Sequence, residues 1–163
     1  MARWRPWLWG WRPVAIAAGV FVLMQLVPYR IHNHAVAAEP QWDSPQTREL
    51  VVRACYDCHS NQAAQPWYSK VAPASWLVAY DANGGRNKLN FSEWDARQAR
   101  EARDVVEVIE EGSMPPGRYT WFGLHRDSKL TPTEQNALIA GLEATLGNST
   151  AGDSSGKGSG PGR

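Results

Sequence analysis

The sequence contains only two cysteines, and both belong to the pentapeptide Cys55-Tyr56-Asp57-Cys58-His59. This C-x-x-C-H spacing is the attachment signature of a c-type haem. Two thiols at this spacing can each add to one vinyl group of a porphyrin, and the histidine that follows can bind the iron. The pattern therefore predicts one covalent haem c, with Cys55 and Cys58 as thioethers and His59 as the proximal iron ligand.

Two other kinds of site are built on a C-x-x-C pair, and each requires more than the pair itself. A structural zinc ion needs four ligands, and the other histidines available here, His32, His34 and His125, are scattered along the chain. A thiol oxidoreductase places its cysteines at the start of a helix that follows a strand, whereas residues 45–54 have a helical pattern. The rest of the sequence therefore favours haem over both alternatives.

Length and charge limit the remaining functions. The chain has 163 residues and a formal net charge of +1, which is consistent with one domain of ordinary size. Charged residues of both signs are interspersed, so the sequence has no basic patch of the kind that binds DNA or RNA. We therefore expect no nucleic acid partner, and nothing in the sequence points to a substrate pocket.

The N-terminus has the features of an export or anchoring segment. Arginines and tryptophans precede an apolar run from Val14 to Val27. This run resembles the core of a signal peptide, because a membrane span takes about 17 to 25 residues, so its length leaves the choice open. The longer aromatic-flanked stretch, 7–27, favours a retained anchor. A small-residue cleavage pattern occurs only around 35–38, well beyond the apolar run, and this favours an anchor too.

The positions of the arginines predict the orientation and the domain boundaries. Arginines before the span indicate that residues 1–13 are cytoplasmic, that 14–28 form the membrane anchor or signal segment, and that the rest lies on the periplasmic or outer side of a bacterial cytoplasmic membrane. We expect a linker at 29–41 and a haem-binding domain at 42–147. Residues 148–163 are rich in Gly, Ser, Thr, Asp and Pro, which predicts a disordered tail.

Local start and stop signals predict four helices in the domain. Ser44-Pro45 begins a helix that delivers the chain to Cys55. A second helix covers 73–80 and ends before Gly84-Gly85. Ser92 and Asp95 form a capping-box variant that begins a long helix closed by Gly112, and Thr131-Pro132-Thr133-Glu134 begins the last helix, which ends at Gly147.

No run alternates in the manner of a strand, so the expected fold is a small, mostly α, cytochrome c-like domain after one transmembrane helix. Its long loops would pack on the haem, which would supply much of the apolar core.

The second axial position on the iron has two candidates. Met114 lies on a loop stiffened by Pro115 and Pro116, directly after a helix stop, and is the only methionine available to the domain. Its alternative role is that of a residue that fills a gap in the core. His125 is the other candidate, in an aromatic loop. Ligation by a methionine and a histidine raises the reduction potential relative to two histidines, so Met114 predicts a fairly oxidising haem.

Other side chains are candidates for contacts to the porphyrin. Aromatic residues could line the macrocycle or could equally form ordinary core, and they are Trp67, Tyr68, Trp76, Phe91 and Trp94. A carbonyl of Pro66 or Pro73 could accept the Nδ1 proton of His59 and fix its tautomer. Arg86 and Tyr119 are candidates for binding the propionates.

Several segments together resemble the haem-binding domain family, whose members are single-haem, cytochrome c-like proteins with an N-terminal membrane anchor. The similar segments lie between about residues 40 and 146: Trp42-Asp43-Ser44-Pro45, Cys55-Tyr56-Asp57-Cys58-His59-Ser60-Asn61, Pro66-Trp67-Tyr68-Ser69, Leu89-Asn90-Phe91-Ser92-Glu93-Trp94 and Gly112-Ser113-Met114-Pro115-Pro116. The resemblance implies covalent haem c, His59 as proximal ligand and Met114 as distal ligand. The family usually has a threonine shortly before Pro66, where this chain has Gln62-Ala63-Ala64-Gln65.

These features lead to one expected function and two alternatives. We expect a membrane-tethered mono-haem protein that carries single electrons between partner proteins outside the cytoplasmic membrane and is not an enzyme. A haem sensor or peroxidase-like protein would need a displaceable sixth ligand. A thiol oxidoreductase would need cysteines that are not already thioethers.

Overall fold

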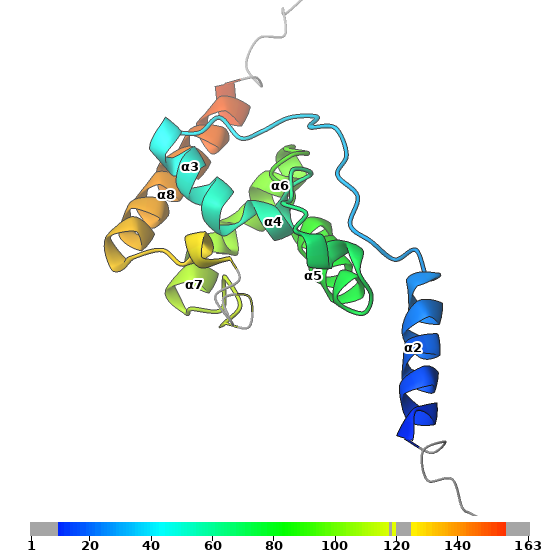
Figure 1. Ribbon diagram of the computed structural model, residues 1–163. Helices are drawn as coiled ribbons and strands as arrows, with labels where there is room; N and C mark the ends of the chain where they lie inside the picture. Colours follow the sequence, from blue (N-terminus) through cyan, green and yellow to red (C-terminus); the bar gives the residue numbers. More distant parts are fainter. Residues whose placement is uncertain (1–9, 118, 120–124, 156–163) are drawn as a thin grey trace, which may run out of the picture. The chain divides into compact units, whose positions relative to one another are not determined.

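The computed structural model describes residues 10–117, 119 and 125–155. Helices and one isolated bridge, between Ala38 and Glu93, make up all the regular structure of the described residues (Figure 1). This confirms the mostly α fold. The described residues divide into two compact units, one within 1–31 and 65–81 and the other within 32–64 and 82–163.

The first unit joins the N-terminal helix to a segment from the middle of the chain. It contains α2 (Arg12–Gln25), the 3₁₀ helix η1 (Trp67–Lys70) and the first residues of α5 (Ala74–Lys88). The side-chain amide of Gln25 connects them, because its oxygen accepts from Ala72 N at 2.9 Å and its nitrogen donates to Ala72 O at 3.2 Å. One glutamine thus satisfies both backbone groups of Ala72.

The predicted membrane segment, 14–28, is helical only to Gln25. Among the described residues, no helix has the length and the apolar character that crossing a bilayer requires. The transmembrane helix of the predicted fold is therefore not found there, and residues 1–9 of the predicted cytoplasmic segment lie outside the described residues.

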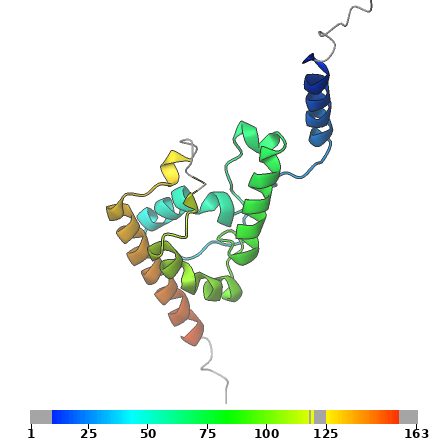
Figure 2. The ribbon, with the colours of Figure 1, turned by 90° about the horizontal axis from the view of Figure 1, so that it is seen from below.

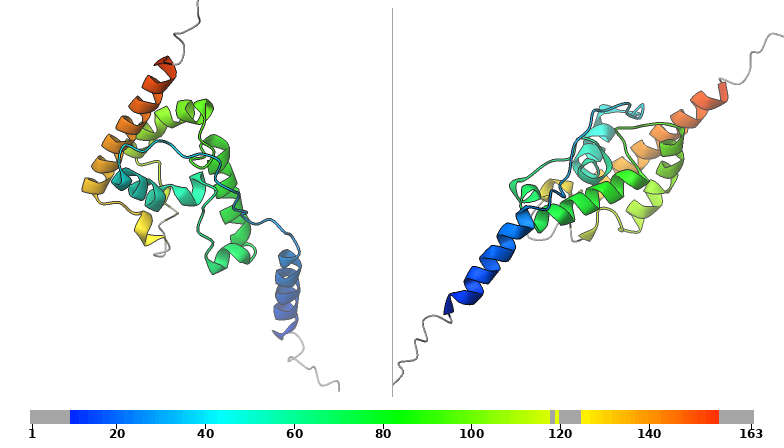
Figure 3. Two further views of the ribbon diagram at one scale, coloured as in Figure 1. Left: turned by 90° about the horizontal axis from the view of Figure 1, so that it is seen from above. Right: turned by 90° about the vertical axis from the view of Figure 1, so that its right-hand side faces the viewer.

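The second unit holds the C-x-x-C-H segment and most of the helices. In chain order these are α3 (Pro45–Ala54), α4 (Tyr56–His59), the end of α5, α6 (Ala96–Glu101), η2 (Ala102–Asp104), α7 (Val105–Glu110), η4 (Arg126–Ser128) and α8 (Pro132–Ser155). Helices α3 and α7 both pack against α8 (Figure 2). Helices α6, η2 and α7 follow one another along a bent path (Figure 3).

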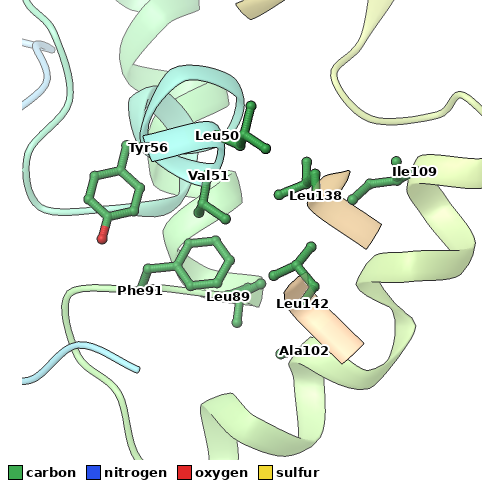
Figure 4. Packing of buried hydrophobic residues seen from close by; sticks show 9 residues of the cluster. All are labelled: Leu50, Val51, Tyr56, Leu89, Phe91, Ala102, Ile109, Leu138 and Leu142. Carbon is green, nitrogen blue, oxygen red and sulfur yellow. The ribbon is translucent and has the colours of Figure 1, made fainter. Parts of the chain in front are cut away.

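The second unit has an apolar core made of its own side chains (Figure 4). It is formed by Leu50, Val51, Tyr56, Leu89, Phe91, Ala102, Ile109, Leu138 and Leu142. Each large apolar side chain buried in this way contributes about 1.5–3 kcal/mol to folding. The expectation that a haem would supply much of the core is therefore too strong, because the helices already pack on one another.

Two predicted helix starts are confirmed. The Ser44 hydroxyl accepts from Thr47 N at 3.2 Å, and α3 then runs from Pro45 to Ala54 as predicted. At the start of α8, Thr131 N donates to the Glu134 carboxylate at 2.8 Å while Glu134 N donates to the Thr131 hydroxyl at 3.2 Å. These are the two reciprocal hydrogen bonds of a capping box.

Three predicted helix boundaries are wrong. Helix α5 continues through Gly84-Gly85 to Lys88. Asp95, whose carboxylate accepts from Gln98 N at 2.8 Å, caps α6 without Ser92. The predicted long helix is interrupted by η2, and its last part, α7, ends at Glu110, two residues before Gly112, whose φ is +69°. Helix α8 passes Gly147 and reaches Ser155, and residues 156–163 of the predicted tail lie outside the described residues.

Part of the predicted linker, 29–41, is bound to the second unit rather than extended away from it. Ala37 N and Ala38 N donate to Ser92 O at 2.9 and 3.3 Å, and Trp94 N donates to Ala38 O at 3.1 Å. The side chain of Asn33 donates to Ala63 O at 2.8 Å. We call residues 32–38 the strap, and the folded unit therefore begins before Trp42.

The capping box of α8 predicts an acid-sensitive contribution to stability. Hydrogen bonds from Arg53, and then from Thr131, lower the pKa of Glu134 from 4.5 to about 2. Because the folded pKa is the lower one, the carboxylate stabilises the fold fully above about pH 4.5, and this contribution disappears as the pH falls toward 2. We expect Glu134→Gln to be less stable than the wild type in urea at pH 7 and equally stable near pH 2. Glu143→Gln, on the same helix, is the control, and a constant deficit at every pH would contradict this account.

Candidate functional site

The C-x-x-C-H segment is a single tight turn at the end of α3. Cys55 is the C-cap of that helix, and its N–H donates to Val51 O at 2.8 Å. Cys58 N and His59 N both donate to Cys55 O, at 3.1 and 2.9 Å. Both cysteines are reduced and partly exposed. The local helical geometry thus places two thiols and one imidazole within one turn of the chain.

The imidazole of His59 is held in one tautomer by the backbone. Its Nδ1 lies 3.0 Å from Leu89 O. Because a carbonyl can only accept, Nδ1 carries the proton and Nε2 keeps a lone pair for a metal ion. The predicted partners, Pro66 and Pro73, are therefore wrong, since the acceptor comes from the residue directly after α5.

Burial keeps this imidazole neutral. Desolvation lowers the pKa of His59 from 6.5, and hydrogen bonds to the carbonyls of Leu89 and Gly85 oppose the shift only in part. A neutral imidazole with a fixed tautomer is the form that binds iron. At neutral pH the ring is therefore prepared for ligation without losing a proton first.

A buried network of amides and hydroxyls fixes the backbone after His59. Phe91 N donates to His59 O at 2.8 Å, and Asn61 N donates to the Ser92 hydroxyl at 3.0 Å. The Asn61 side chain accepts from the Asn90 amide at 2.9 Å and donates to Ala35 O at 3.1 Å. Networks of this kind rigidify a site when every member is satisfied. Sequence reasoning assigned Asn61 and Asn90 no role, and their only signal was their place in the segments that resemble the family.

Gly85 explains why α5 runs past the predicted stop. A Cβ built at this position would lie 2.3 Å from Cys58 O, whereas one at Gly84 meets nothing within 4 Å. Gly85 is therefore needed for the close approach of α5 to the backbone of Cys58, and its role is not to end the helix.

Cys55 and Met114 line one cavity of about 250 Å³ in the second unit. Its other lining residues include Ile109, Leu130 and Leu138. The side chain of Met114 is 39% exposed. Ser113 N and Met114 N both donate to Val108 O, at 3.1 and 3.2 Å, so the methionine follows directly on α7. The structure thus brings the predicted distal ligand to the same hollow as one of the two thiols.

His125, the other candidate ligand, faces the middle of the C-x-x-C-H segment. Its Nδ1 lies 3.5 Å from Asp57 Oδ2, and its ring stacks on Tyr119 with centroids 3.9 Å apart. Tyr119 donates its hydroxyl hydrogen to the same carboxylate oxygen. Sequence reasoning gave Asp57 no role, because only the fold places these rings over it. The residues just before His125 lie outside the described part of the chain.

Arg86 occupies a structural position in the second unit. Its Nε donates to Ser60 O at 2.7 Å, while its two terminal nitrogens donate to His32 O at 2.6 Å and to Asn33 Oδ1 at 2.8 Å. It therefore clamps the strap to the turn that follows His59. Its predicted contact to a propionate stays a prediction.

The candidate aromatic residues fall into different environments. Phe91 is 2% exposed and stacks between Tyr56 and Trp94, so it belongs to the protein core. Trp67, Tyr68 and Trp76 belong to the first unit. Trp67 is 77% exposed and its ring contacts Tyr68 edge-on, whereas the indole N–H of Trp76 is buried without a hydrogen bond partner among the described residues. Their contacts to a porphyrin stay predictions.

The environment of Cys55 does not suit a thiol oxidoreductase. Burial, with a smaller contribution from Cys58, raises the pKa of Cys55 to about 12. The reactive form of a redox cysteine is the thiolate, which needs a lowered pKa.

In the part of the chain that the structure describes, no three His, Cys, Asp or Glu side chains gather into a set that could hold a metal ion.

The comparison with known families decides among these possibilities. The sequence matches the model of the haem-binding domain over residues 19–144, which is most of the chain. The chain belongs to the haem-binding domain family. Comparisons with curated proteins and with solved structures give no match. The matched range of this haem-binding domain begins before the predicted boundary at 42 and includes the strap.

The residues of this haem-binding domain fit a haem. Two reduced thiols lie in one turn with an imidazole whose Nε2 remains for the iron. Met114 offers a thioether in the cavity that Cys55 lines. Thioether, imidazole and thiol are the groups through which proteins hold haem iron and its vinyl groups.

Proposed function

We propose that this haem-binding protein carries its haem as the covalent c type and transfers single electrons. The observation that carries the proposal is the His59 imidazole, held neutral with Nδ1 bound to Leu89 O, in the same turn as two reduced thiols. Each thiol would add across one vinyl double bond, so that sulfur gains a carbon, the second vinyl carbon gains the hydrogen and no atom leaves.

The protein's own residues would set the properties of the site. When bound, the haem supplies one-electron redox chemistry at its iron. His59 would hold the iron from one side, and the network of Asn61, Asn90 and Ser92 would keep the His59 backbone in place. The Leu89 carbonyl would increase the electron donation of the imidazole through the Nδ1 proton.

Met114 is the distal ligand in this proposal. It shares a cavity with Cys55, whereas the Nδ1 of His125 faces Asp57. A thioether opposite His59 would raise the potential relative to two histidines. The protein would then accept electrons from a donor and pass them to a more oxidising partner protein.

The proposed setting is the outer side of a bacterial cytoplasmic membrane, with the N-terminal segment as the anchor. Support comes from α2, whose apolar side chains are mostly exposed, among them Val14, Ile16 and Leu23. Exposed apolar residues along a helix mark a surface for lipid or another protein. The N-terminal arginines support the orientation.

The alternative is a haem sensor or peroxidase-like protein with a displaceable sixth ligand. The exposure of Met114 at 39% is the observation that favours it. Carbon monoxide separates the two functions, because it binds ferrous iron rapidly only where the sixth position is open or its ligand is easily displaced. We expect slow and incomplete binding to the purified ferrous protein, and rapid, complete binding would support the sensor.

Two matched variants identify the distal ligand. Met114→Ala should abolish the sulfur-to-iron charge-transfer band of the ferric protein, because no other thioether is available to the domain. It should also speed carbon monoxide binding by about tenfold or more, which corresponds to about 1.4 kcal/mol. His125→Ala should weaken the band without abolishing it and should keep the low-spin spectrum, because Met114 is still present. If only the histidine variant loses the low-spin spectrum, the assignment of Met114 is wrong.

A further inference from the structure

Asp57 connects the C-x-x-C-H turn to the chain that follows Met114. One carboxylate oxygen, Oδ1, accepts from Ala64 N at 2.7 Å, within the segment that continues from His59. The other oxygen, Oδ2, accepts from the Tyr119 hydroxyl and lies 3.5 Å from His125 Nδ1. A single side chain between the two cysteines thus contacts two residues that follow the candidate distal ligand.

Met114 lies between two points of attachment. On its N-terminal side, its own N–H and that of Ser113 are bound to Val108 O at the end of α7. On its C-terminal side, Tyr119 N donates to Pro116 O at 2.8 Å and the Tyr119 hydroxyl binds Asp57. The position of the Met114 backbone therefore depends on α7 at one end and on Asp57 at the other.

The conformation of His125 indicates that its contacts hold it firmly. Its φ is +54°, a left-handed backbone conformation that residues other than glycine rarely adopt. Such a conformation persists where the surroundings over-determine it. The surroundings of His125 are the stacked ring of Tyr119 and the Asp57 carboxylate. In addition, the backbone N–H and the hydroxyl of Ser128 donate to His125 O, at 3.1 and 2.7 Å.

We propose that Asp57 is a positioning residue that keeps Met114 on the iron by binding Tyr119 and His125. The proposal rests on the proposed function, since it requires a haem held by His59 and Met114. Asp57 itself would not touch the iron. It would oppose the outward movement of the Met114 loop that must precede any exchange of the sixth ligand, and His125 would serve this lock instead of ligating.

The test is a comparison of holoproteins that carry Asp57→Asn, Tyr119→Phe or both changes, with all spectra normalised to haem. Each single variant should weaken the sulfur-to-iron band and speed carbon monoxide binding about tenfold, because a hydrogen bond to a charged group is strong enough to shift a two-state equilibrium by that factor. The double variant should be no worse than the more severe single one, because both changes break the same contact.

Glu49→Gln, on α3, and Tyr80→Phe, at an exposed site, are the matched controls and should behave as wild type. If Asp57→Asn yields too little holoprotein, Tyr119→Phe carries the test, since it removes one hydroxyl and leaves the C-x-x-C-H turn unchanged.

The wild-type holoprotein should show the sulfur-to-iron band. If both single variants show the same band and the same rate of carbon monoxide binding as the wild type, the role of Asp57 is overturned and the proposed function stands. A wild-type holoprotein without a sulfur-to-iron band would overturn both. Additive effects in the double variant would show that the two residues act through separate contacts and would overturn the lock.

Discussion

Replacing Gly85 with alanine should destabilise the protein by about 3 kcal/mol, at the upper end of what overpacking a core usually costs. The new Cβ would lie 2.3 Å from Cys58 O and 2.9 Å from Cys58 C, and both are backbone atoms that cannot rotate away. Either α5 or the C-x-x-C-H turn has to move. Because that turn also positions His59, we expect a lower yield of holoprotein together with the loss of stability in urea.

Gly84→Ala is the matched control for this prediction. The same helix contains both glycines, but a Cβ at Gly84 meets nothing within 4 Å. Alanine in a helix interior is favoured over glycine by about 0.5–1 kcal/mol, so this variant should be slightly more stable than wild type. Equal effects of the two substitutions would show that α5 does not pack on Cys58 as described.

Replacing His59 with alanine should remove the low-spin haem spectrum. The two thioethers should still hold the haem on the chain, but the iron would lose its nitrogen ligand. The haem should therefore become high-spin. Added imidazole should restore the low-spin spectrum, because it can occupy the space that the side chain leaves on the iron.

The control for His59 is His34→Ala, which removes an exposed histidine from the strap. This variant should keep the wild-type spectrum and haem content. A low-spin spectrum in His59→Ala without added imidazole would show that another residue is the proximal ligand.

The sequence predicts the elements whose signals are local. The starts of α3 and α8 depend on residues within four positions of one another, namely a hydroxyl, a proline and a reciprocal glutamate, so they can be recognised before any fold is known. The C-x-x-C-H motif is local in the same sense. The family match confirms that this motif belongs to a haem-binding domain.

The errors arise where contacts distant in sequence decide the outcome. Gly84-Gly85 has the composition of a helix stop, but its second glycine serves the approach to Cys58, twenty-seven residues earlier in the chain. The acceptor for His59 is likewise distant in sequence, because it is the backbone carbonyl of Leu89. Every residue has a backbone carbonyl, so residue types do not show which one accepts. Residues 32–38 have no periodicity because they bind as a single extended strap.

The candidate site shows the same division. The thiols and His59 follow from the motif, whereas the placement of Met114 in the cavity that Cys55 lines depends on the packing of α7 on α8. Asp57 could not be assigned a role from sequence, because its partners come from residues 119 and 125. Arg86 was predicted to bind a propionate, which stays a prediction, and its observed partners are the strap and Ser60.

Covalent attachment is the central claim, and the mass of the denatured protein tests it most directly. Protein matured in cells with a competent export and haem-attachment system, then extracted with acidified organic solvent, should keep its colour and the added mass of one haem. Variants with alanine at both Cys55 and Cys58 should release it. A wild-type chain that emerges colourless and with the mass of the polypeptide alone would contradict the account.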